Sequence, residues 1–407
     1  MLDINFIREN YQKVKEGALG KGFDIKIDEI LKLDAEKRKL IVEIDNKRFL
    51  QKKEKNIELA KKLKQEIKNL EKKLEDVSRK LTELLLKIPN LPAEDVKFGK
   101  DEAENEVIKE VGSLPHFDFS VKSGDEIGEL LGIIDTKRAA KTSGSRFGFI
   151  KGAGAILEFA LIQFVFDFLL KEGFVPVIPP VMLKEIIMRG LGYLEMGEDE
   201  MYYLEKDKLF LAATAEHPIV GMHSDEIFDE DELPLRYVGF SSAFRREAGS
   251  YGKDVKGIFR VHQFDKVEMV SFVRPEDNDK EHYYLLDLEE KIIQMLGLPY
   301  RVVKMCSGDL GFPVARKFDI EVYFPSQYRY RETHSCSTCT DFQSRRLNIR
   351  FKEKKTGKNR PVYILNATGL AIGRTILAIL ENYQQKDGSV LVPKVLQKYT
   401  GFEKITK

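Results

Sequence analysis

The amino-acid sequence predicts an α+β protein, in which an antiparallel sheet with helices on one face follows an antiparallel hairpin of two long helices. Between Leu63 and Ile88, apolar residues recur at alternating intervals of four and three, which is the heptad pattern of packed helices. Neither proline nor glycine occurs between Phe23 and Pro89, so long helices can run without interruption. After about Val111, short apolar runs alternate with polar and Gly-rich loops, which favours strands connected by hairpins.

The composition indicates a folded protein of two or three domains. The chain has 407 residues, of which 43% are hydrophobic and 33% charged, and this excludes a disordered chain. The most apolar stretch, Ala155–Leu170, is interrupted by Glu158, Gln163 and Asp167, so we expect a buried helix there and no membrane span. The N-terminal residues lack the apolar segment of a signal peptide, and three cysteines are too few for a disulfide framework. We therefore expect a cytoplasmic protein.

The two helices of the hairpin carry complementary apolar seams. The seam of the second helix consists of Leu63, Ile67, Leu70, Leu74, Val77, Leu81, Leu84 and Ile88, and that of the first of Ile30, Leu33, Leu40 and Ile44, with breaks at Lys37 and Lys47. We expect the tip near Lys53–Asn56, and the prolines of Ile88–Pro92 end the second helix. The pattern predicts an antiparallel helical hairpin over about residues 27–88.

The hairpin carries most of the excess positive charge. The whole chain has a net charge of +1, but residues 30–88 contain 18 basic and 11 acidic residues. Eight basic residues lie between Lys47 and Lys64, against two acidic ones. A basic tip suits the phosphate backbone of a nucleic acid. The alternative is a plain coiled coil for dimerisation, which has less use for charge at its tip.

In the remainder of the chain, the sequence pattern predicts several strands and two main helices. Strands are expected at Gly173–Met182, Leu235–Phe244, Gly257–Val273, Tyr300–Met305, Ala315–Phe324 and Tyr363–Asn366, and helices at Ala155–Leu170 and Leu370–Gln384. The prolines of the first strand require an edge or an interface, because proline cannot donate to the ladder.

A nucleotide site without a P-loop is predicted for the segment that begins FRREAGSYG. The sequence contains no GxxxxGK[ST] motif. A strand, a loop and a returning strand are expected to place Arg245 and Glu247 on one face, and Arg260, Phe264 and Glu268 on one face as well. Arginines neutralise phosphates, an aromatic ring stacks on a purine, and a carboxylate binds an amine. These are the parts of a site for ATP and an amino acid, and a surface ladder of cross-strand ion pairs is the alternative.

Four segments resemble the class II aminoacyl-tRNA synthetases, and specifically the seryl-tRNA synthetases. FRREAGSYG with HQFDKVEM resembles motif 2, and GFVPVIPPVM resembles motif 1, the strand at the dimer interface. Asn366–Leu396 resembles motif 3, and the hairpin ending in IPNLP resembles the tRNA-binding arm. The resemblance covers essentially the whole chain in the right order. It implies a class II catalytic domain over residues 98–407, preceded by a tRNA-binding domain over residues 1–97 with a coiled-coil arm.

The resemblance implies roles for individual residues. Serine is implied to bind at Thr214, Ala215, Glu216, Arg245, Glu268, Asn366 and Thr368. ATP is implied to bind at Arg245, Arg246, Glu247, Arg260, Val261, Phe264, Glu332, Thr333, His334, Ser335 and Arg374, with Mg²⁺ at Glu332 and Ser335. The implied catalytic residues are Arg245 at the α-phosphate, Arg260 at the γ-phosphate and Arg374 on the other side of the phosphates. Phe264 is implied to lie under the adenine, whose amino group Glu247 reads.

Three departures from the family pattern stand out. Arg246 occupies a position where the family more often has a small polar residue, and strand alternation turns it away from Arg245. His334 replaces a small residue beside the implied metal position, which affects the local ATP geometry. The arm is also shorter at its tip than is usual in the family.

Cysteine and histidine suggest one further chemistry. Cys336 and Cys339, with His334 and Cys306, offer the ligand types of a zinc site. No second paired motif accompanies them, so a pair of small buried thiols in a strand is the favoured interpretation. His217, directly after the Thr-Ala-Glu element, is interpreted as a packed neighbour of the site and not as a catalyst.

The function implied by the resemblance is that of a serine–tRNA ligase. Such an enzyme uses ATP to form seryl-adenylate and transfers serine to the 3′ end of tRNA(Ser), and of tRNA(Sec) in hosts that have it. A homodimer through motif 1 is also implied. The alternatives are an inactive tRNA-binding paralogue and a ligase that charges a carrier protein, which is expected to lack the arm.

Overall fold

The computed structural model describes residues 1–195, 198–248 and 256–407. The chain divides into two compact units, Met1–Pro92 and Ala93–Lys407. The division lies close to the domain boundary expected at residue 97. Each unit is described by itself.

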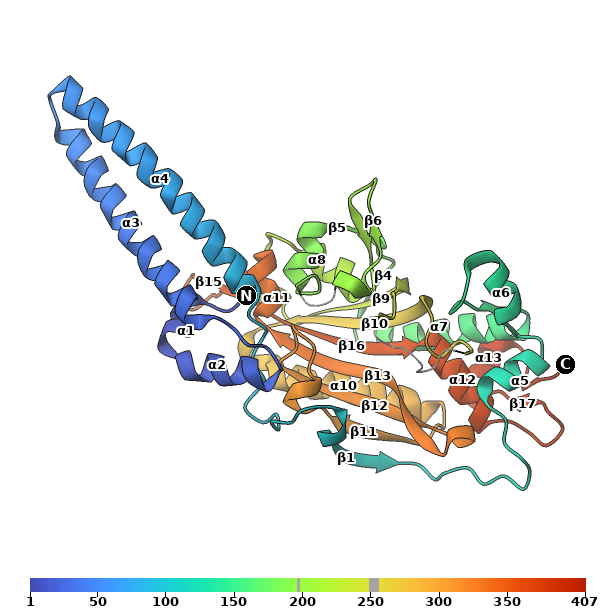
Figure 1. The fold of residues 1–407 in the computed structure, drawn as a ribbon. Coiled ribbons are helices and arrows are strands. Elements are labelled where there is room, and N and C mark those ends of the chain that lie inside the picture. The colour runs from blue at the N-terminus through green and yellow to red at the C-terminus, as the bar shows by residue number, and fades with distance from the viewer. Residues whose placement is uncertain (196–197, 249–255) are drawn as a thin grey trace. The chain divides into compact units, whose positions relative to one another are not determined.

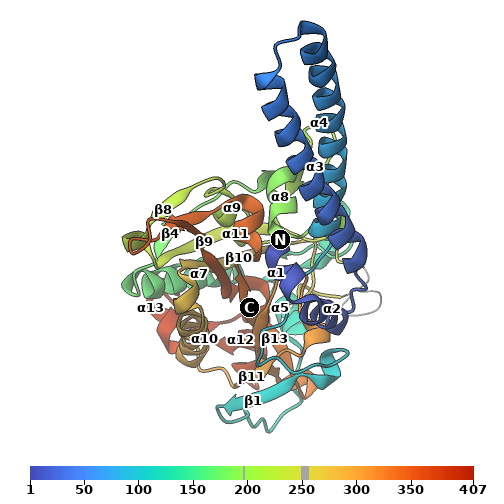
Figure 2. The same ribbon diagram turned by 90° about the vertical axis from the view of Figure 1, so that its left-hand side faces the viewer.

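The first unit contains two short helices and a long helical hairpin, drawn in blue in Figures 1 and 2. Its helices are α1 (Ile4–Glu9), α2 (Tyr11–Gly20), α3 (Ile27–Lys53) and α4 (Ile57–Leu86). The Asn56 side chain accepts hydrogen bonds from the backbone N–H groups of Glu58 and Leu59 and so caps α4. The predicted hairpin and its tip are confirmed.

Every residue of the predicted α4 seam is buried or half-buried. The partner seam on α3 has a polar position, Asp34, which is buried and ion-paired with Arg8 at 3.4 Å and Arg38 at 3.0 Å. Further along, Lys47 breaks the seam and pairs with Glu66 of α4 at 2.7 Å. Lys47, a predicted break of the seam, therefore coincides with an ion pair between the two helices, whereas the Asp34 pairs lie within α3 and between α3 and α1.

An eight-stranded sheet forms the centre of the second unit (Figure 1). Its strands, in spatial order, are β1 (Glu106–Val111), β11 (Tyr300–Lys304), β12 (Arg316–Phe324), β13 (Arg329–Thr340), β16 (Tyr363–Ala371), β10 (Gln263–Val273), β9 (Leu235–Phe244) and β4 (Val175–Val177). All neighbouring pairs are antiparallel except β4 and β9, which are parallel. The predicted antiparallel sheet is confirmed, and the proline-containing strand does lie at its edge.

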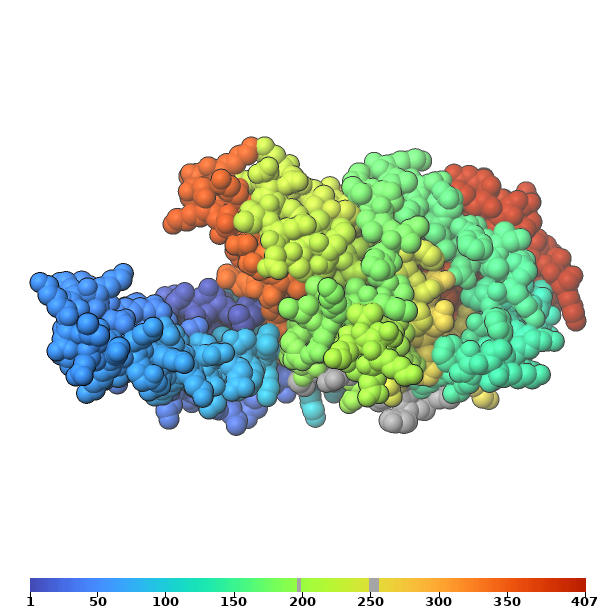
Figure 3. Space-filling view, turned by 90° about the horizontal axis from the view of Figure 1, so that it is seen from above, coloured from blue at the N-terminus to red at the C-terminus, as the bar shows by residue number. Residues whose placement is uncertain are grey.

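The strand limits differ from the prediction where loops intervene. The strand expected from Gly257 begins only at Gln263, and the strand expected over Gly173–Met182 is reduced to β4. Four small sheets complete the strands: β2 (Ile134–Asp135) with β3 (Phe149–Ile150), β5 (Met182–Lys184) with β7 (Leu209–Leu211) and β6 (Tyr203–Leu204), β8 (Ile227–Asp229) with β14 (Arg350–Lys352) and β15 (Asn359–Pro361), and β17 (Val390–Leu391) with β18 (Lys404–Ile405). Figure 3 shows the orange segment around β14 and β15 beside the yellow-green segment around β8.

Helices cover both faces of the sheet, whereas the sequence predicted them on one. The main core lies between the sheet and α7 (Ala153–Lys171), α10 (Asn278–Met295) and α12 (Ile372–Asn382). A second core on the opposite face involves α8 (Glu185–Leu191), α9 (Glu216–Gly221) and α11 (Phe342–Leu347). The same unit contains the short helices α5 (Gly124–Leu130), α6 (Thr136–Ser143) and α13 (Gln397–Thr400), and Ile127 of α5 belongs to the main core. Successive residues Met269 and Val270 enter different cores, because side chains alternate along β10.

Helix α7 is long and apolar enough to cross a membrane by length and composition, with a mean hydropathy of 1.9. Its residues Leu157, Leu161 and Leu169 are fully buried in the main core. An apolar composition of this kind is also typical of a buried core helix. The predicted position of α7 in the core is confirmed.

Candidate functional site

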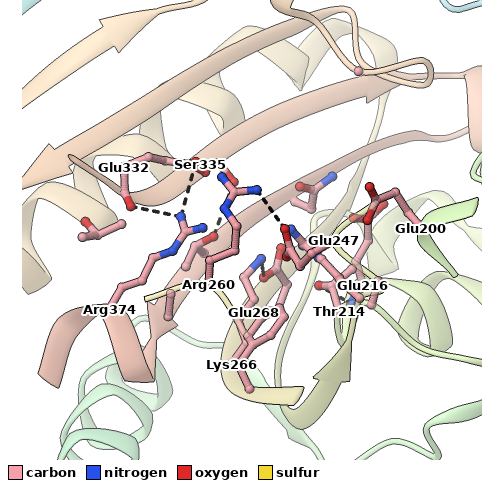
Figure 4. Close-up of a pocket in the computed structure, with 18 of the residues that line it drawn as sticks. Glu200, Thr214, Glu216, Glu247, Arg260, Lys266, Glu268, Glu332, Ser335 and Arg374 are labelled. Atoms are coloured by element: carbon pink, nitrogen blue, oxygen red, sulfur yellow. Dashed lines mark hydrogen bonds and ion pairs between the residues drawn. The ribbon is translucent and has the colours of Figure 1, made fainter. Parts of the chain in front are cut away.

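A cavity of about 500 Å³ opens at the sheet, lined mainly by residues of β10, β13 and β16 and by the first turn of α12 (Figure 4). Of the residues implied by the sequence, the lining contains Thr214, Glu216, Arg245, Glu247, Arg260, Val261, Phe264, Glu268, Glu332, Thr333, Ser335, Asn366, Thr368 and Arg374. Residues more than 150 positions apart in the chain thus converge on one site. The surface-ladder interpretation is wrong, because these side chains line a cavity.

Two predicted cavity residues, Arg260 and Glu247, form an ion pair. The Arg260 Nη1 lies 2.8 Å from the Glu247 Oε2 (Figure 4). Glu247 follows the end of β9 and Arg260 precedes the start of β10, so their positions in the cavity do not come from strand alternation, contrary to the prediction. Glu247 has a φ of 53°, in the left-handed backbone region that residues other than glycine seldom adopt. The loop residues 249–255 lie outside the described residues.

Phe264 provides an aromatic surface at the cavity. Its ring centroid lies 5.3 Å from the guanidinium carbon of Arg245, within cation–π range. Phe264 and Glu268 lie four residues apart on β10 and both line the cavity, as the predicted alternation requires. An aromatic face beside a cation can hold a flat heterocycle next to its phosphate groups.

Arg374 and Glu332 both line the cavity and form an ion pair in its wall. The Arg374 Nη1 donates to the Glu332 carbonyl oxygen at 3.0 Å and lies 3.3 Å from its carboxylate (Figure 4). Burial favours the neutral carboxyl, but the cations of Arg374, Lys317 and Arg245 outweigh it and lower the pKa of Glu332 to about 2. Glu332 is therefore an anion at neutral pH.

Glu268 lies deep in the cavity, with 1% of its surface exposed. Burial raises the pKa of this carboxyl to about 7, although the ion pair with Lys266 opposes the shift. Thr368 pairs with Glu268 across the ladder, and its Oγ1 lies 3.5 Å from the Ser335 Oγ. A carboxyl and hydroxyl groups thus surround one small polar space.

A second buried carboxyl, Glu216, completes this end of the cavity. It accepts hydrogen bonds from the Gln343 Nε2 at 2.8 Å and from the Tyr193 hydroxyl at 3.3 Å, and burial raises its pKa. His217 packs against the Tyr193 ring at 4.4 Å, and burial lowers the pKa of this histidine to about 3. A neutral buried imidazole agrees with its predicted place as a packed neighbour, although His217 does line the cavity.

Three residues implied for the site do not line the cavity: Ala215, Arg246 and His334. The guanidinium of Arg246 lies over the Tyr202 ring, and because Arg246 follows the end of β9, this position is not a result of the predicted strand alternation. His334 is fully buried in β13, on the face opposite to the cavity. Their implied contacts with substrates stay predictions.

Several lining residues are absent from the sequence-based set, among them Tyr193, Glu200, Lys266, Lys317 and Ser337. Lys266 could have been found, because it lies between Phe264 and Glu268 with the same strand parity. The others come from segments whose convergence depends on the tertiary fold.

The three cysteines are buried and unpaired with one another. Within residues 1–195, 198–248 and 256–407, no group of three or more His, Cys, Asp and Glu side chains is arranged to hold a metal ion. Buried thiols in β13 match the favoured interpretation of Cys336 and Cys339.

The antiparallel sheet and its cavity define a class II aminoacyl-tRNA synthetase core, and residues 201–383 match the family model described as tRNA synthetase class II core domain (G, H, P, S and T). Residues 1–92 match the model of the seryl-tRNA synthetase N-terminal domain. The chain belongs to the seryl-tRNA synthetase family, as its sequence motifs predicted.

Full-length relatives support this assignment. A serine–tRNA ligase of Thermodesulfovibrio yellowstonii is 46% identical over 100% of both chains. The crystal structure of seryl-tRNA synthetase from Pyrococcus horikoshii complexed with ATP has 41% identity and a TM-score of 0.96, over 100% of this chain and 99% of that chain. The cytoplasmic serine–tRNA ligase of Naegleria fowleri, in complex with AMP, has 34% identity and a TM-score of 0.92 over the same shares.

Proposed function

We propose that this chain is a serine–tRNA ligase that activates L-serine with ATP and transfers it to tRNA(Ser). The observation that carries the proposal is the convergence of Arg245, Arg260 and Arg374 with the buried Glu268 in one cavity. Three guanidinium groups suit a triphosphate, and a buried carboxyl suits a small ammonium-bearing substrate. The names of full-length relatives agree with this activity.

In the proposed reaction, a carboxylate oxygen of serine attacks the α-phosphorus of ATP. The new P–O bond forms as the bond to pyrophosphate breaks, which yields seryl-adenylate and pyrophosphate. Arg245 holds the α-phosphate and the serine carboxylate, while Arg260 and Arg374 neutralise charge on the outer phosphates. In the structure Arg260 is paired with Glu247, so the proposed ATP binding would exchange this ion pair for contacts with phosphate and adenine.

The serine side chain is proposed to bind between Glu268 and Thr368. A hydroxyl-bearing substrate satisfies these buried polar groups, whereas alanine leaves them unpaired. Thr214, Ala215, Glu216 and Asn366 complete the proposed serine site. Their burial agrees with a site that excludes water.

The adenine is proposed to stack on Phe264, with Glu247 at its amino group. Arg246, Val261, Thr333, His334 and Ser335 complete the proposed ATP site. For His334 this is a role beside the site, because the side chain does not line the cavity.

Magnesium fits one part of the cavity. Glu332 and Ser335 present a carboxylate and a hydroxyl, and Mg²⁺ prefers oxygen ligands. The low pKa of Glu332 keeps this carboxylate ionised and available to a cation. When bound there, Mg²⁺ would supply positive charge that neutralises the phosphates.

The helical hairpin is proposed to bind tRNA. We assign residues 1–97 to a tRNA-binding domain and residues 98–407 to the catalytic domain. The basic residues between Lys47 and Lys64 suit the phosphate backbone and shape of tRNA more than its base sequence. The same arm would serve tRNA(Sec) in a host that has it.

A homodimer in the cytoplasm is also proposed. Among the described residues, the edge strand β4 leaves one side of the sheet unpaired, and apolar side chains in it and next to it are exposed, including Val175 at 47% and Ile178 at 85%. A second copy of the chain would cover them. Sedimentation at micromolar concentration is expected to give twice the chain mass of 46.8 kDa.

The test of the function is pyrophosphate exchange into ATP with each of the twenty amino acids. Exchange with serine alone, followed by charging of tRNA(Ser), is expected. An inactive tRNA-binding paralogue would bind tRNA without exchange, and a carrier-protein ligase would exchange with serine without charging tRNA. The retained arginines and the arm argue against these two alternatives.

A further inference from the structure

Strand β13 contains one extra residue at Thr333, directly at the cavity. In the ladder with β12, Ile320 faces His334, but the next residue, Glu321, faces Glu332. With strict alternation Glu332 would lie on the same face as His334, away from the cavity. Because of the extra residue, Glu332 and Thr333 both line the cavity.

Strand β16 contains a second extra residue, Gly369. In the ladder with β10, Val267 faces Leu370, whereas Glu268 faces Thr368. This bulge therefore lies at the pair of residues that form the proposed serine site. It also reverses the alternation of the strand just before α12, whose first turn lines the cavity.

His334 contacts both bulges from behind the sheet. Cys336 pairs with Ala367, so the continued antiparallel register places His334 opposite Gly369. The His334 Nδ1 lies 2.9 Å from the Thr333 Oγ1, and the ring lies close to the Gly369 backbone, although the Nε2 has no partner that meets hydrogen-bond geometry among the described residues. The side chain is fully buried, and burial lowers its pKa to about 3, so the imidazole is neutral.

Glu289 approaches the β16 bulge from helix α10. It is fully buried on the side of α10 that also carries Asn278 and His282, both of which bond to β13. The Thr368 backbone lies close to the Glu289 carboxyl. Neither carboxylate oxygen of Glu289 has a partner that meets hydrogen-bond geometry among the described residues. Burial raises the pKa of Glu289 well above its ordinary value.

We propose that His334, supported by Glu289, is a positioning residue that fixes the two bulges and thereby sets Glu332 and Thr368 in the same cavity wall. The inference rests on the proposed function, because it assigns serine to Thr368 and ATP to Glu332. It replaces the direct ATP contact implied for His334 by an indirect role.

The physical reason is the backbone of a bulge. An extra residue interrupts the ladder and leaves backbone groups without a strand partner. Buried polar groups need partners, and polar side chains behind the sheet can supply them. Loss of one such contact is expected to let the bulge relax and to displace Thr368 far enough to weaken a substrate hydrogen bond.

The test compares His334→Leu with His282→Leu in the full-length enzyme. His282 is an equally buried histidine, bonded to the Cys336 carbonyl and to Arg316, and does not contact either bulge. Melting temperature and the exchange kinetics for serine and ATP are measured for both. His334→Leu is expected to raise the serine KM about tenfold, and His282→Leu to lower stability with a serine KM within twofold of wild type. His334→Gln, which restores a polar group, is expected to recover part of the serine KM.

Three results would overturn the inference. They are a folded His334→Leu enzyme with wild-type KM values, equal KM changes in the His282 control, and no recovery by His334→Gln. If His334→Leu does not fold, Glu289→Leu is measured instead, and wild-type kinetics in that folded variant contradict the proposal. Absence of serine exchange in the wild-type enzyme would instead overturn the proposed function itself.

Discussion

Lys266 and Glu268 form an ion pair within the cavity, two residues apart on the same face of β10. Both side chains are buried, so the pair is shielded from bulk water. Burial nevertheless raises the pKa of Glu268 to about 7, which places its ionisation in the physiological range. Lys266 therefore opposes the effect of burial on the charge of the proposed serine site.

This relationship predicts a pH dependence of serine binding. Glu268 is ionised above its pKa of about 7 and neutral below it, so the carboxylate that is proposed to bind serine loses its charge as the pH falls. We expect kcat/KM for serine to fall about tenfold between pH 8 and pH 6, measured by exchange at saturating ATP. Removal of the cation in Lys266→Met raises the pKa further and moves the fall to higher pH.

The conservative variant Lys266→Arg is the control for this experiment. It keeps the positive charge and is expected to leave the midpoint within half a pH unit of wild type. A pH profile that is the same in Lys266→Met and wild type would contradict the role of the pair.

Thr368→Val is predicted to reduce selectivity for serine over alanine. The substitution keeps the volume but removes the hydroxyl that is proposed to bind the substrate hydroxyl. We expect kcat/KM for serine to fall about 100-fold, with the ATP KM within threefold of wild type. Thr375→Val is a matched control, because Thr375 is buried in α12 and donates to the Ala371 carbonyl. Unchanged serine kinetics in Thr368→Val would refute the assignment.

Arg374→Gln is predicted to slow adenylate formation without unfolding the protein. Removal of one preorganised cation at a site of developing phosphate charge typically costs about 100-fold to 1000-fold in kcat. Single-turnover measurement of seryl-adenylate tests this. Arg331→Gln serves as control, because Arg331 lies over the same Phe259 ring at 3.9 Å but does not line the cavity. Equal losses in the two variants would indicate damage to local packing.

Neutralisation of the arm tip is predicted to affect charging alone. The triple variant Lys52→Gln, Lys53→Gln and Lys55→Gln removes cations next to the turn between α3 and α4. We expect the tRNA KM to rise about tenfold and its salt dependence to become weaker, because fewer phosphates are neutralised. Serine exchange is expected to stay at the wild-type level.

A matched triple variant in the second unit controls for total charge. Lys206, Lys355 and Lys358 are exposed, and their replacement by Gln changes the net charge equally. If this variant also raised the tRNA KM tenfold, the effect would be one of overall charge and not of the arm.

Patterns along the sequence predicted the elements in which local spacing determines the structure. The seam of α4, the strand Leu235–Phe244 and the apolar helix α7 follow directly from apolar periodicity. Most site residues were found because their motifs resemble a known family. Alternation alone could not place Glu332, since it depends on the bulge at Thr333.

Other features depend on tertiary structure and leave little trace in the sequence. Glu247 and Arg260 meet because the chain turns outside the strands, at a φ of 53° for Glu247. Tyr193 and Gln343 reach Glu216 from segments 150 residues apart. A buried carboxyl such as Glu289 looks like one of many charged residues on a helix until the fold places it against the sheet.

The heptad seam of the hairpin and its ion pair between Lys47 and Glu66 bear on how such an arm can change in length. Lys47 of α3 pairs with Glu66 of α4 and Glu36 of α3 with Lys73 of α4, so these contacts between the two helices fix their register. Insertion of seven residues into each helix would extend the tip by about 10 Å and preserve the seam. An insertion of three or four residues in only one helix would turn its basic face around the axis. Arm length is therefore adjustable in discrete steps, each of which presents the same side of the tip.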